Sequence, residues 1–192
     1  KVMDHPQVLA ELDDVSDAVS TVARRSESLM QFVGSYRRLT RLPPPNKQHV
    51  PVIDLLQQVQ NIACQDWQAL GIRLDIELTP NTLSLGVDKD MVEQLLINLL
   101  LNAQQALGAQ QDKRVCIRGL LNKRGHVVLE IADNGPGVPD ELKQQIFVPF
   151  FTTKREGSGV GLALTRQVMI AHGGNVKVEN QATGGARFTL TF

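Results

Sequence analysis

Cysteine is scarce in this sequence of 192 residues. Only Cys64 and Cys116 are present, and neither stands in a Cys-x-x-Cys or Cys/His arrangement. A secreted disulfide framework or a zinc site needs more cysteines or that spacing, so the sequence excludes both. Two isolated thiols favour a reducing setting, and we expect a cytoplasmic location, which includes the cytoplasmic part of a membrane-anchored protein.

The sequence also lacks an excess of charge of either sign and a long hydrophobic run. The 20 Lys and Arg residues balance the 20 Asp and Glu residues. A nucleic-acid binder usually carries a basic excess, and a membrane-surface domain carries a basic face. The longest apolar run, residues 95–101, is interrupted by Asn98 and is far shorter than the ~20 residues of a membrane span. We expect no nucleic-acid partner and no membrane contact.

The remaining composition is that of a globular protein. Hydrophobic residues make up 42% and charged residues 21%, so a disordered chain is a poor description. The length suits one full domain with a short appendage. The sequence begins at Lys1 without a signal-peptide pattern, and we expect it to be part of a longer protein.

The first 42 residues predict a long amphipathic helix. Apolar residues recur at spacings of four and three, with Ser26 filling one gap; they are Val8, Leu12, Val15, Val19, Val22, Leu29, Val33 and Tyr36. One such helix cannot bury its stripe alone, so it should pack on a partner helix in this chain or another. Three prolines at 43–45 then end the helix. We therefore divide the chain into a helical region (1–42), a stiff linker (43–51) and a domain (52–192).

The domain alternates helical and strand patterns. We expect helices at 53–70, from an Asp88 or Asp90 cap to about Leu107, briefly after Pro139, and at 161–172. Strands are expected at 72–78, 115–121, 127–133, 175–180 and 187–192, with a hairpin turn at 122–126. This order predicts a two-layer α/β sandwich with the helices on one face of the sheet.

Four amides form one stripe on the helix that ends near Leu107. Gln94, Asn98, Asn102 and Gln105 are spaced four, four and three residues apart among leucines. A plain solvent-facing stripe is one interpretation. Asparagine is a weak helix former, however, and amide oxygens are ligands suited to Mg²⁺ carried by phosphates.

Nine of the fifteen glycines lie in the last 58 residues. The segment Asp133-Asn-Gly-Pro-Gly137 follows a predicted strand and is either a capped turn or a carboxylate aimed at a ligand. The segment Gly157-Ser-Gly-Val-Gly161 precedes a helix and is either a hinge or an anion-binding turn. Between them, Phe147, Phe150 and Phe151 precede Lys154, which suits either a piece of core or a lid with a phosphate-facing lysine.

Together these elements resemble the catalytic ATP-binding domain of sensor histidine kinases, in the GHKL ATPase superfamily with DNA gyrase, MutL and the heat-shock chaperones. The resemblance covers about residues 50–192 and implies the Bergerat-type ATP-binding fold. Residues 98–103 resemble the N box, 133–137 and 157–161 the two glycine boxes, 147–154 the phenylalanine box, and 184–189 the closing turn and strand. The helix before Leu42 resembles part of the kinase dimerisation hairpin, which implies a homodimer.

The resemblance assigns roles within an ATP and Mg²⁺ site. Asn102 would hold Mg²⁺ with help from Asn98, and Asp133 would accept the adenine amino group. Asn98 and Lys154 would be the catalytic residues, with Lys154 near the terminal phosphate. The remaining cofactor-binding residues would be Gly135, Gly137, Gly157, Gly159, Gly161 and Thr189. The loop from Val148 to Val160 is expected to be a mobile lid.

The activity implied is transfer of the γ-phosphoryl group of Mg-ATP to a histidine, for relay to the receiver domain of a response regulator. The chaperone, gyrase and MutL branches carry a water-activating glutamate where this chain has Asn98. An ATP-driven clamp of that type, or a non-catalytic nucleotide-binding dimer module, remains the alternative. None of His5, His49, His126 and His172 stands in a phosphoacceptor pattern. We therefore expect the acceptor histidine outside this chain and no autophosphorylation of the fragment.

Overall fold

The computed structural model describes residues 15, 18–23, 25–26, 30, 33–34, 42–108, 110–154 and 157–192. The chain forms two compact units, Lys1–Thr40 and Arg41–Phe192. In the first unit every described residue is helical, and Val15, Val19, Val22 and Val33 are each more than half exposed. The other apolar members of the predicted stripe, Val8, Leu12, Leu29 and Tyr36, lie outside the described residues.

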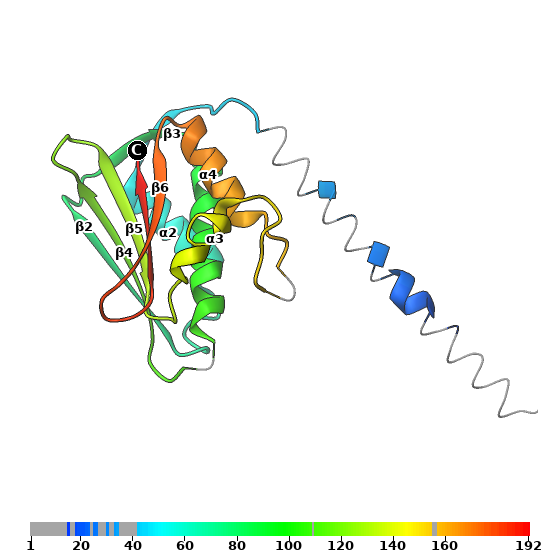
Figure 1. Ribbon diagram of the computed structural model, residues 1–192. Coiled ribbons are helices and arrows are strands. Elements are labelled where there is room, and N and C mark those ends of the chain that lie inside the picture. The colour runs from blue at the N-terminus through cyan, green and yellow to red at the C-terminus, as the bar shows by residue number, and fades with distance from the viewer. Residues whose placement is uncertain are drawn as a thin grey trace, which may run out of the picture. The chain divides into compact units, whose positions relative to one another are not determined.

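The second unit is a two-layer α/β sandwich, which confirms the predicted fold class (Figure 1). Its main sheet has the strand order β2-β4-β5-β7-β6, and a separate pair is formed by β1 and β3. The strands are β1 (Gln48–Pro51), β2 (Ile72–Thr79), β3 (Ser84–Val87), β4 (Lys113–Leu121), β5 (Val127–Asp133), β6 (Asn175–Asn180) and β7 (Ala186–Thr191). Only β2 and β4 pair in parallel; all other pairs in the described residues are antiparallel.

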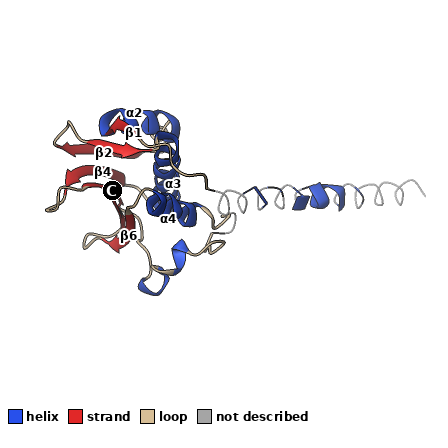
Figure 2. Cartoon of the chain, turned by 90° about the horizontal axis from the view of Figure 1, so that it is seen from above, coloured by secondary structure: helices blue, strands red, loops and turns tan. Residues whose placement is uncertain are grey.

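Three α-helices cover one face of the main sheet (Figure 2). They are α2 (Val52–Ala63), α3 (Lys89–Leu107) and α4 (Gly161–Ala171), and two short 3₁₀ helices, η1 (Asp140–Leu142) and η2 (Gln145–Phe147), lie between β5 and α4. None of the helices in the described part of the chain has the length and apolarity to span a bilayer.

The core lies between the helices and the inner face of the sheet. Side chains alternate across a strand, so Leu129 and Ile131 of β5 face the same side as Phe188 and Leu190 of β7. These four are buried with five leucines of α3, which are Leu95, Leu96, Leu99, Leu100 and Leu107. The amide stripe of α3 lies outside this core, as does the exposed Leu101.

Two sequence predictions differ from the structure. The helix expected at 53–70 ends at Ala63, because the chain turns to bury Trp67, whose indole Nε1 donates to Gln104 Oε1 at 2.9 Å. Strand β3 was not predicted, although its Leu85 and Val87 are buried. It pairs with β1, so the end of the segment expected to be a linker is a strand.

The start of α3 and the end of α4 are joined by polar contacts. Of the two predicted caps, Asp88 is the one used, since its Oδ1 accepts from the backbone N–H of Met91 at 3.1 Å. His172 is buried, with Nδ1 2.8 Å from the Val168 carbonyl oxygen and Nε2 accepting from the Asp88 N–H at 3.0 Å. The first contact engages a carbonyl group in the last turn of α4, and the second ties α4 to α3.

Candidate functional site

Asp133 ends β5 with its carboxylate on the inner, helix-facing side of the sheet. The residue is 4% exposed, and its Oδ1 accepts from the backbone N–H groups of Gly135 (2.9 Å) and Ala186 (3.3 Å). Burial raises the pKa of this carboxyl group, against the opposing effect of the two N–H donors. In the described part of the chain both hydrogen bonds to this carboxylate reach Oδ1, so Oδ2 is available to a ligand donor.

The loop after Asp133 is held by the turn between β6 and β7. Asn180 both accepts from the Val138 N–H and donates to the Val138 carbonyl oxygen, each at 2.8 Å. Gln181 donates to the carbonyl oxygen of Asp133 at 2.7 Å. These two amides fix the glycine-rich loop, and sequence reasoning missed them because they lie 42 to 48 residues from their partners.

Asn98 lies against the first turn of α4. Its Nδ2 donates to Thr165 Oγ1 at 3.0 Å, and that hydroxyl donates to the Gly161 carbonyl oxygen at 3.1 Å. A Cβ atom at position 161 would overlap Asn98 Oδ1. Glycine at 161 therefore lets the two helices approach until the predicted metal ligand and the glycine-rich turn are neighbours.

Lys154 reaches from the loop before α4 to the amide stripe of α3. Its Nζ donates to Asn102 Oδ1 at 2.9 Å and to Gln105 Oε1 at 2.5 Å. The loss of hydration in this position lowers the pKa of the lysine. The structure thus brings together the predicted catalytic lysine and the predicted metal ligand Asn102, and it adds Gln105, whose stripe position was the only sequence signal.

The loop drawn in yellow before α4 in Figure 1 combines an anchored start with a strained turn. Phe147 is buried and belongs to the core, whereas Phe150 is 37% exposed and has a positive φ of 67°. The N–H of Phe150 donates to the Gly159 carbonyl oxygen at 2.8 Å, and a Cβ at 159 would lie 2.8 Å from Phe150 Cα. Phe147 therefore agrees with the core interpretation, whereas Phe150 lies on the loop, whose role as a lid stays a prediction.

The N-terminus of α4 offers donors to an anion. The helix begins at Gly161 without a side-chain hydrogen bond from its N-cap residue. The first N–H groups of a helix have no intrahelical acceptor and carry the positive end of the helix dipole. Lys154 precedes this end in the chain and adds a full positive charge, so the region favours a negatively charged group.

Thr189 is the predicted site residue that the structure does not bring to this region. It pairs with Glu130 of β5 and Lys177 of β6. Residues directly opposite each other on neighbouring strands share one face of the sheet, so Thr189 lies on the same face as Glu130. Asp133 is three positions from Glu130, and side chains alternate along a strand, so Glu130 faces away from the side that Asp133 faces. Thr189 therefore lies on the outer face. The residue of β7 that contacts Asp133 is Ala186, at the start of the strand.

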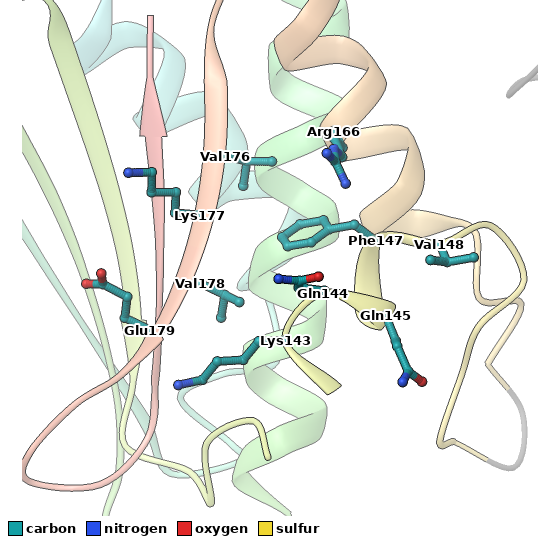
Figure 3. Close-up of a pocket in the computed structure, with 10 residues that line it drawn as sticks. All are labelled: Lys143, Gln144, Gln145, Phe147, Val148, Arg166, Val176, Lys177, Val178 and Glu179. Carbon is teal, nitrogen blue, oxygen red and sulfur yellow. The ribbon is translucent and has the colours of Figure 1, made fainter. Parts of the chain in front are cut away.

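A separate groove of about 720 Å³ lies beside the edge strand β6 (Figure 3). Val176 and Val178 point into it from β6, and the Phe147 ring lies across from them, near Arg166 of α4. Phe147 and Val148, at the start of the predicted phenylalanine box, line this groove, but Asp133, Asn98, Asn102 and Lys154 do not.

Metal binding at the amide stripe would require negative charge from elsewhere. Among the described residues, no group of three or more His, Cys, Asp or Glu side chains could hold a metal ion. Two neutral amide oxygens one helical turn apart are hard ligands but weak ones alone. The donor set therefore fits Mg²⁺ that arrives on a phosphate chain, and does not fit a free resident metal.

The comparisons with known proteins agree on one family. The histidine kinase-, DNA gyrase B- and HSP90-like ATPase family matches residues 87–192. Sensor histidine kinase ZraS of Klebsiella oxytoca is 32% identical over 169 residues, which are 88% of this chain and 36% of that protein. The chain thus spans little more than a third of the length of this relative and of its Salmonella typhimurium counterpart.

Solved structures show the same fold. A nucleotide-free catalytic domain of histidine kinase ThkA has a TM-score of 0.69 and 28% identity, covering 77% of this chain and 95% of that one. Full-length ShkA in complex with AMPPNP has a TM-score of 0.74 and 26% identity, covering 92% and 38%. ThkA in complex with the response regulator protein TrrA shares the fold at 24% identity and a TM-score of 0.71, covering 99% and 52%.

Proposed function

Because the chain belongs to the histidine kinase-, DNA gyrase B- and HSP90-like ATPase family, we propose that its second unit binds Mg-ATP and transfers the γ-phosphoryl group to a histidine outside this chain. The observation that carries this proposal is the buried carboxylate of Asp133 with an available Oδ2 on the helix-facing side of the sheet. A buried acceptor-only group selects a ligand with an N–H donor.

Adenine supplies that donor through its exocyclic amino group. Asp133 Oδ2 would accept from it, while Gly135 and Gly137 let the base approach the bare backbone of the loop. Asn180 and Gln181 hold this loop from the other side, so the acceptor is already in place before the ligand binds. Such pre-organisation removes an ordering cost from binding.

The triphosphate would run from Asp133 toward the N-terminus of α4. Gly157, Gly159 and Gly161 leave room for phosphate oxygens near backbone N–H groups, and Lys154 would meet the terminal phosphate. Asn102, with Asn98, would hold Mg²⁺ through amide oxygens. When bound, the ion would neutralise phosphate charge and orient the phosphate chain.

Asn98 distinguishes transfer from hydrolysis. An amide cannot take a proton from water, so this position lacks the base that an ATP-hydrolysing clamp requires. The γ-phosphoryl group is then kept for a stronger nucleophile, such as a neutral imidazole. This argues against the clamp of the MutL and chaperone type, and the buried Asp133 argues against a module without nucleotide.

The wider context of the activity forms part of the same proposal. The phosphoryl group would pass from the histidine to the receiver domain of a response regulator, and the chain would form a homodimer through its N-terminal helix region. We place this chemistry in the cytoplasm. The support is the similarity to sensor histidine kinases along 88% of the chain.

Calorimetric titration of the 192-residue chain with Mg-ATP and Mg-GTP tests the proposal. ATP should bind ten- to a hundredfold more tightly, because guanine presents a carbonyl to Asp133 and a charged hydrogen bond is worth ~1.5 to 3 kcal/mol. No binding of either nucleotide would refute the function. Equal affinities would remove Asp133 from adenine recognition.

The role of Asn102 is tested with Asn102→Ala. In a full-length kinase that contains this chain, the variant should lose Mg²⁺-dependent phosphoryl transfer, while nucleotide binding in EDTA should change little. Alanine is the better helix former, so α3 should remain folded, which circular dichroism checks. Phosphoryl transfer at the wild-type rate would mean that Asn102 is a surface residue without a role in binding Mg²⁺.

A further inference from the structure

The position of the Lys154 ammonium is the starting observation. It lies between two neutral amide oxygens of α3, one from Asn102 and one from Gln105. These amides are three positions apart in the sequence, so they project from the same side of the helix. The lysine comes from a loop segment 49 to 52 residues further along the chain. A side chain therefore bridges the loop and the helix at the oxygen that would ligate Mg²⁺.

We propose that Gln105 is a positioning residue that holds the Lys154 ammonium over α3 in the nucleotide-free protein, and that Lys154 competes with Mg²⁺ for Asn102. The competition between Lys154 and Mg²⁺ rests on the proposed function. The positioning of Lys154 by Gln105 concerns only contacts within the nucleotide-free chain.

Electrostatics explains the competition. An ammonium 2.9 Å from Asn102 Oδ1 places a positive charge where a divalent cation would bind, and two cations repel strongly at such distances. Mg-ATP can therefore bind at Asn102 only after Lys154 leaves that oxygen. The departing ammonium would gain the phosphates as new partners, so the nucleotide itself compensates for the lost bonds.

Gln105 decides how firmly the ammonium is held. Asn102 is shared between the two cations, whereas Gln105 serves the lysine alone, and it makes the shorter of the two contacts. Gln94 belongs to the same stripe but makes no side-chain hydrogen bond with any part of the chain that the structure describes. The stripe therefore contains a natural control residue.

Two substitutions at position 105 should act in opposite directions. Gln105→Leu removes the acceptor and keeps the bulk, whereas Gln105→Glu replaces a neutral acceptor with a charged one. Hydrogen exchange of residues 148–160 in the nucleotide-free chain should be faster in the leucine variant and slower in the glutamate variant, each by roughly three- to tenfold for a partly exposed charged contact. A merely structural role would move both variants the same way.

Nucleotide affinity supplies the second measurement. The leucine variant should bind Mg-ATP more tightly and the glutamate variant more weakly, by a similar three- to tenfold factor. Lys154→Met should also accelerate lid exchange, and adding Gln105→Leu to it should have no further effect, because the lysine substitution already removes the contact with Gln105. Gln94→Leu and Gln94→Glu should change neither readout.

The outcomes separate the two proposals. Lid exchange that is unchanged, or shifted in the same direction, in both Gln105 variants would overturn the positioning role. Additive effects of Gln105→Leu and Lys154→Met would overturn it too. If no variant and no wild-type chain binds Mg-ATP while lid exchange responds as expected, the proposed function fails and the contact between Gln105 and Lys154 stands.

Discussion

Asp133 is a buried acid whose carboxylate has lost most of its hydration. Burial raises its pKa, and two backbone N–H donors oppose the shift without cancelling it. A residue chosen for stability alone would be neutral here, because a buried charge is costly without a charged partner. We therefore interpret the carboxylate as a binding group. The rest of the fold offsets the free-energy cost of burying it.

This burial predicts a pH-dependent stability that Asp133→Asn should remove. The native chain holds a proton on Asp133 at higher pH than the unfolded chain does, so the wild-type protein loses stability as the pH rises from about 4 through the raised pKa. Asparagine keeps the Oδ1 acceptor and carries no charge. Urea unfolding across this range should give a flatter profile for the variant, and equal slopes would contradict the prediction.

The placement of residues was predictable from sequence where spacing alone sets it. Asn98 and Asn102 share one side of α3 because about one helical turn separates them, and no tertiary information is needed. The position of Thr189 depended on the parity of β7 relative to β5, which only the observed register gives. The contact of Lys154 with Gln105 spans 49 residues and has no local signal.

At the scale of elements, the close approach of α3 and α4 depends on one glycine. Gly161→Ala would push the Asn98 amide away from Thr165 and cost ~0.5 to 1.5 kcal/mol for that hydrogen bond, while alanine favours the helix by up to ~1 kcal/mol. The net change in the free energy of unfolding should stay within about 1 kcal/mol.

Nucleotide binding should be more sensitive than stability in this variant. Displacing Asn98 disturbs the proposed metal ligands, so Mg-ATP affinity of Gly161→Ala should fall about tenfold, the equivalent of ~1.4 kcal/mol. Gly86→Ala is the matched control, since a Cβ there meets nothing within 4 Å. A large loss of stability with unchanged affinity would mean that Gly161 serves packing alone.

Element boundaries were less predictable than element types. The apolar pattern after Ala63 continued to suggest a helix, but burial of Trp67 against Gln104 favoured a turn. Strand β3 has four residues, too few for a periodic signal, and its partner β1 lies in a proline-bearing segment. Tertiary contacts determine both the end of α2 and the formation of β3, because they outweigh local helix and strand propensity.

At the scale of the whole molecule, the valines of the N-terminal unit predict self-association. Val19 and Val22 are each more than 60% exposed in the single chain. Burying one valine is worth about 1.5 kcal/mol or more, so Val19→Glu with Val22→Glu should weaken a dimer at least a hundredfold in sedimentation equilibrium. Thr21→Glu, off the stripe, should not. A wild-type chain that stays monomeric at high concentration would refute the proposed homodimer.

The last prediction joins the nucleotide site to the histidines. The 192-residue chain should bind ATP without phosphorylating itself, because no described histidine is a free nucleophile on a helix. His49 lies in β1 with Nε2 2.8 Å from Ser84 Oγ, and His126 lies in the turn between β4 and β5. His172 uses both ring nitrogens within the fold, and His5 lies outside the described residues.

Incubation with γ-labelled ATP and Mg²⁺, followed by an acid-lability assay, measures this directly. The expected result is no acid-labile label on a sample whose ATP binding is verified by calorimetry, since phosphohistidine is the acid-labile product. Substituting His49 or His172 by glutamine should leave that result unchanged, and the same variants show whether a weak background signal maps to either ring. Stoichiometric acid-labile label on His5 would contradict the proposal that the acceptor histidine lies outside this chain. The acceptor would then be a residue of the N-terminal unit.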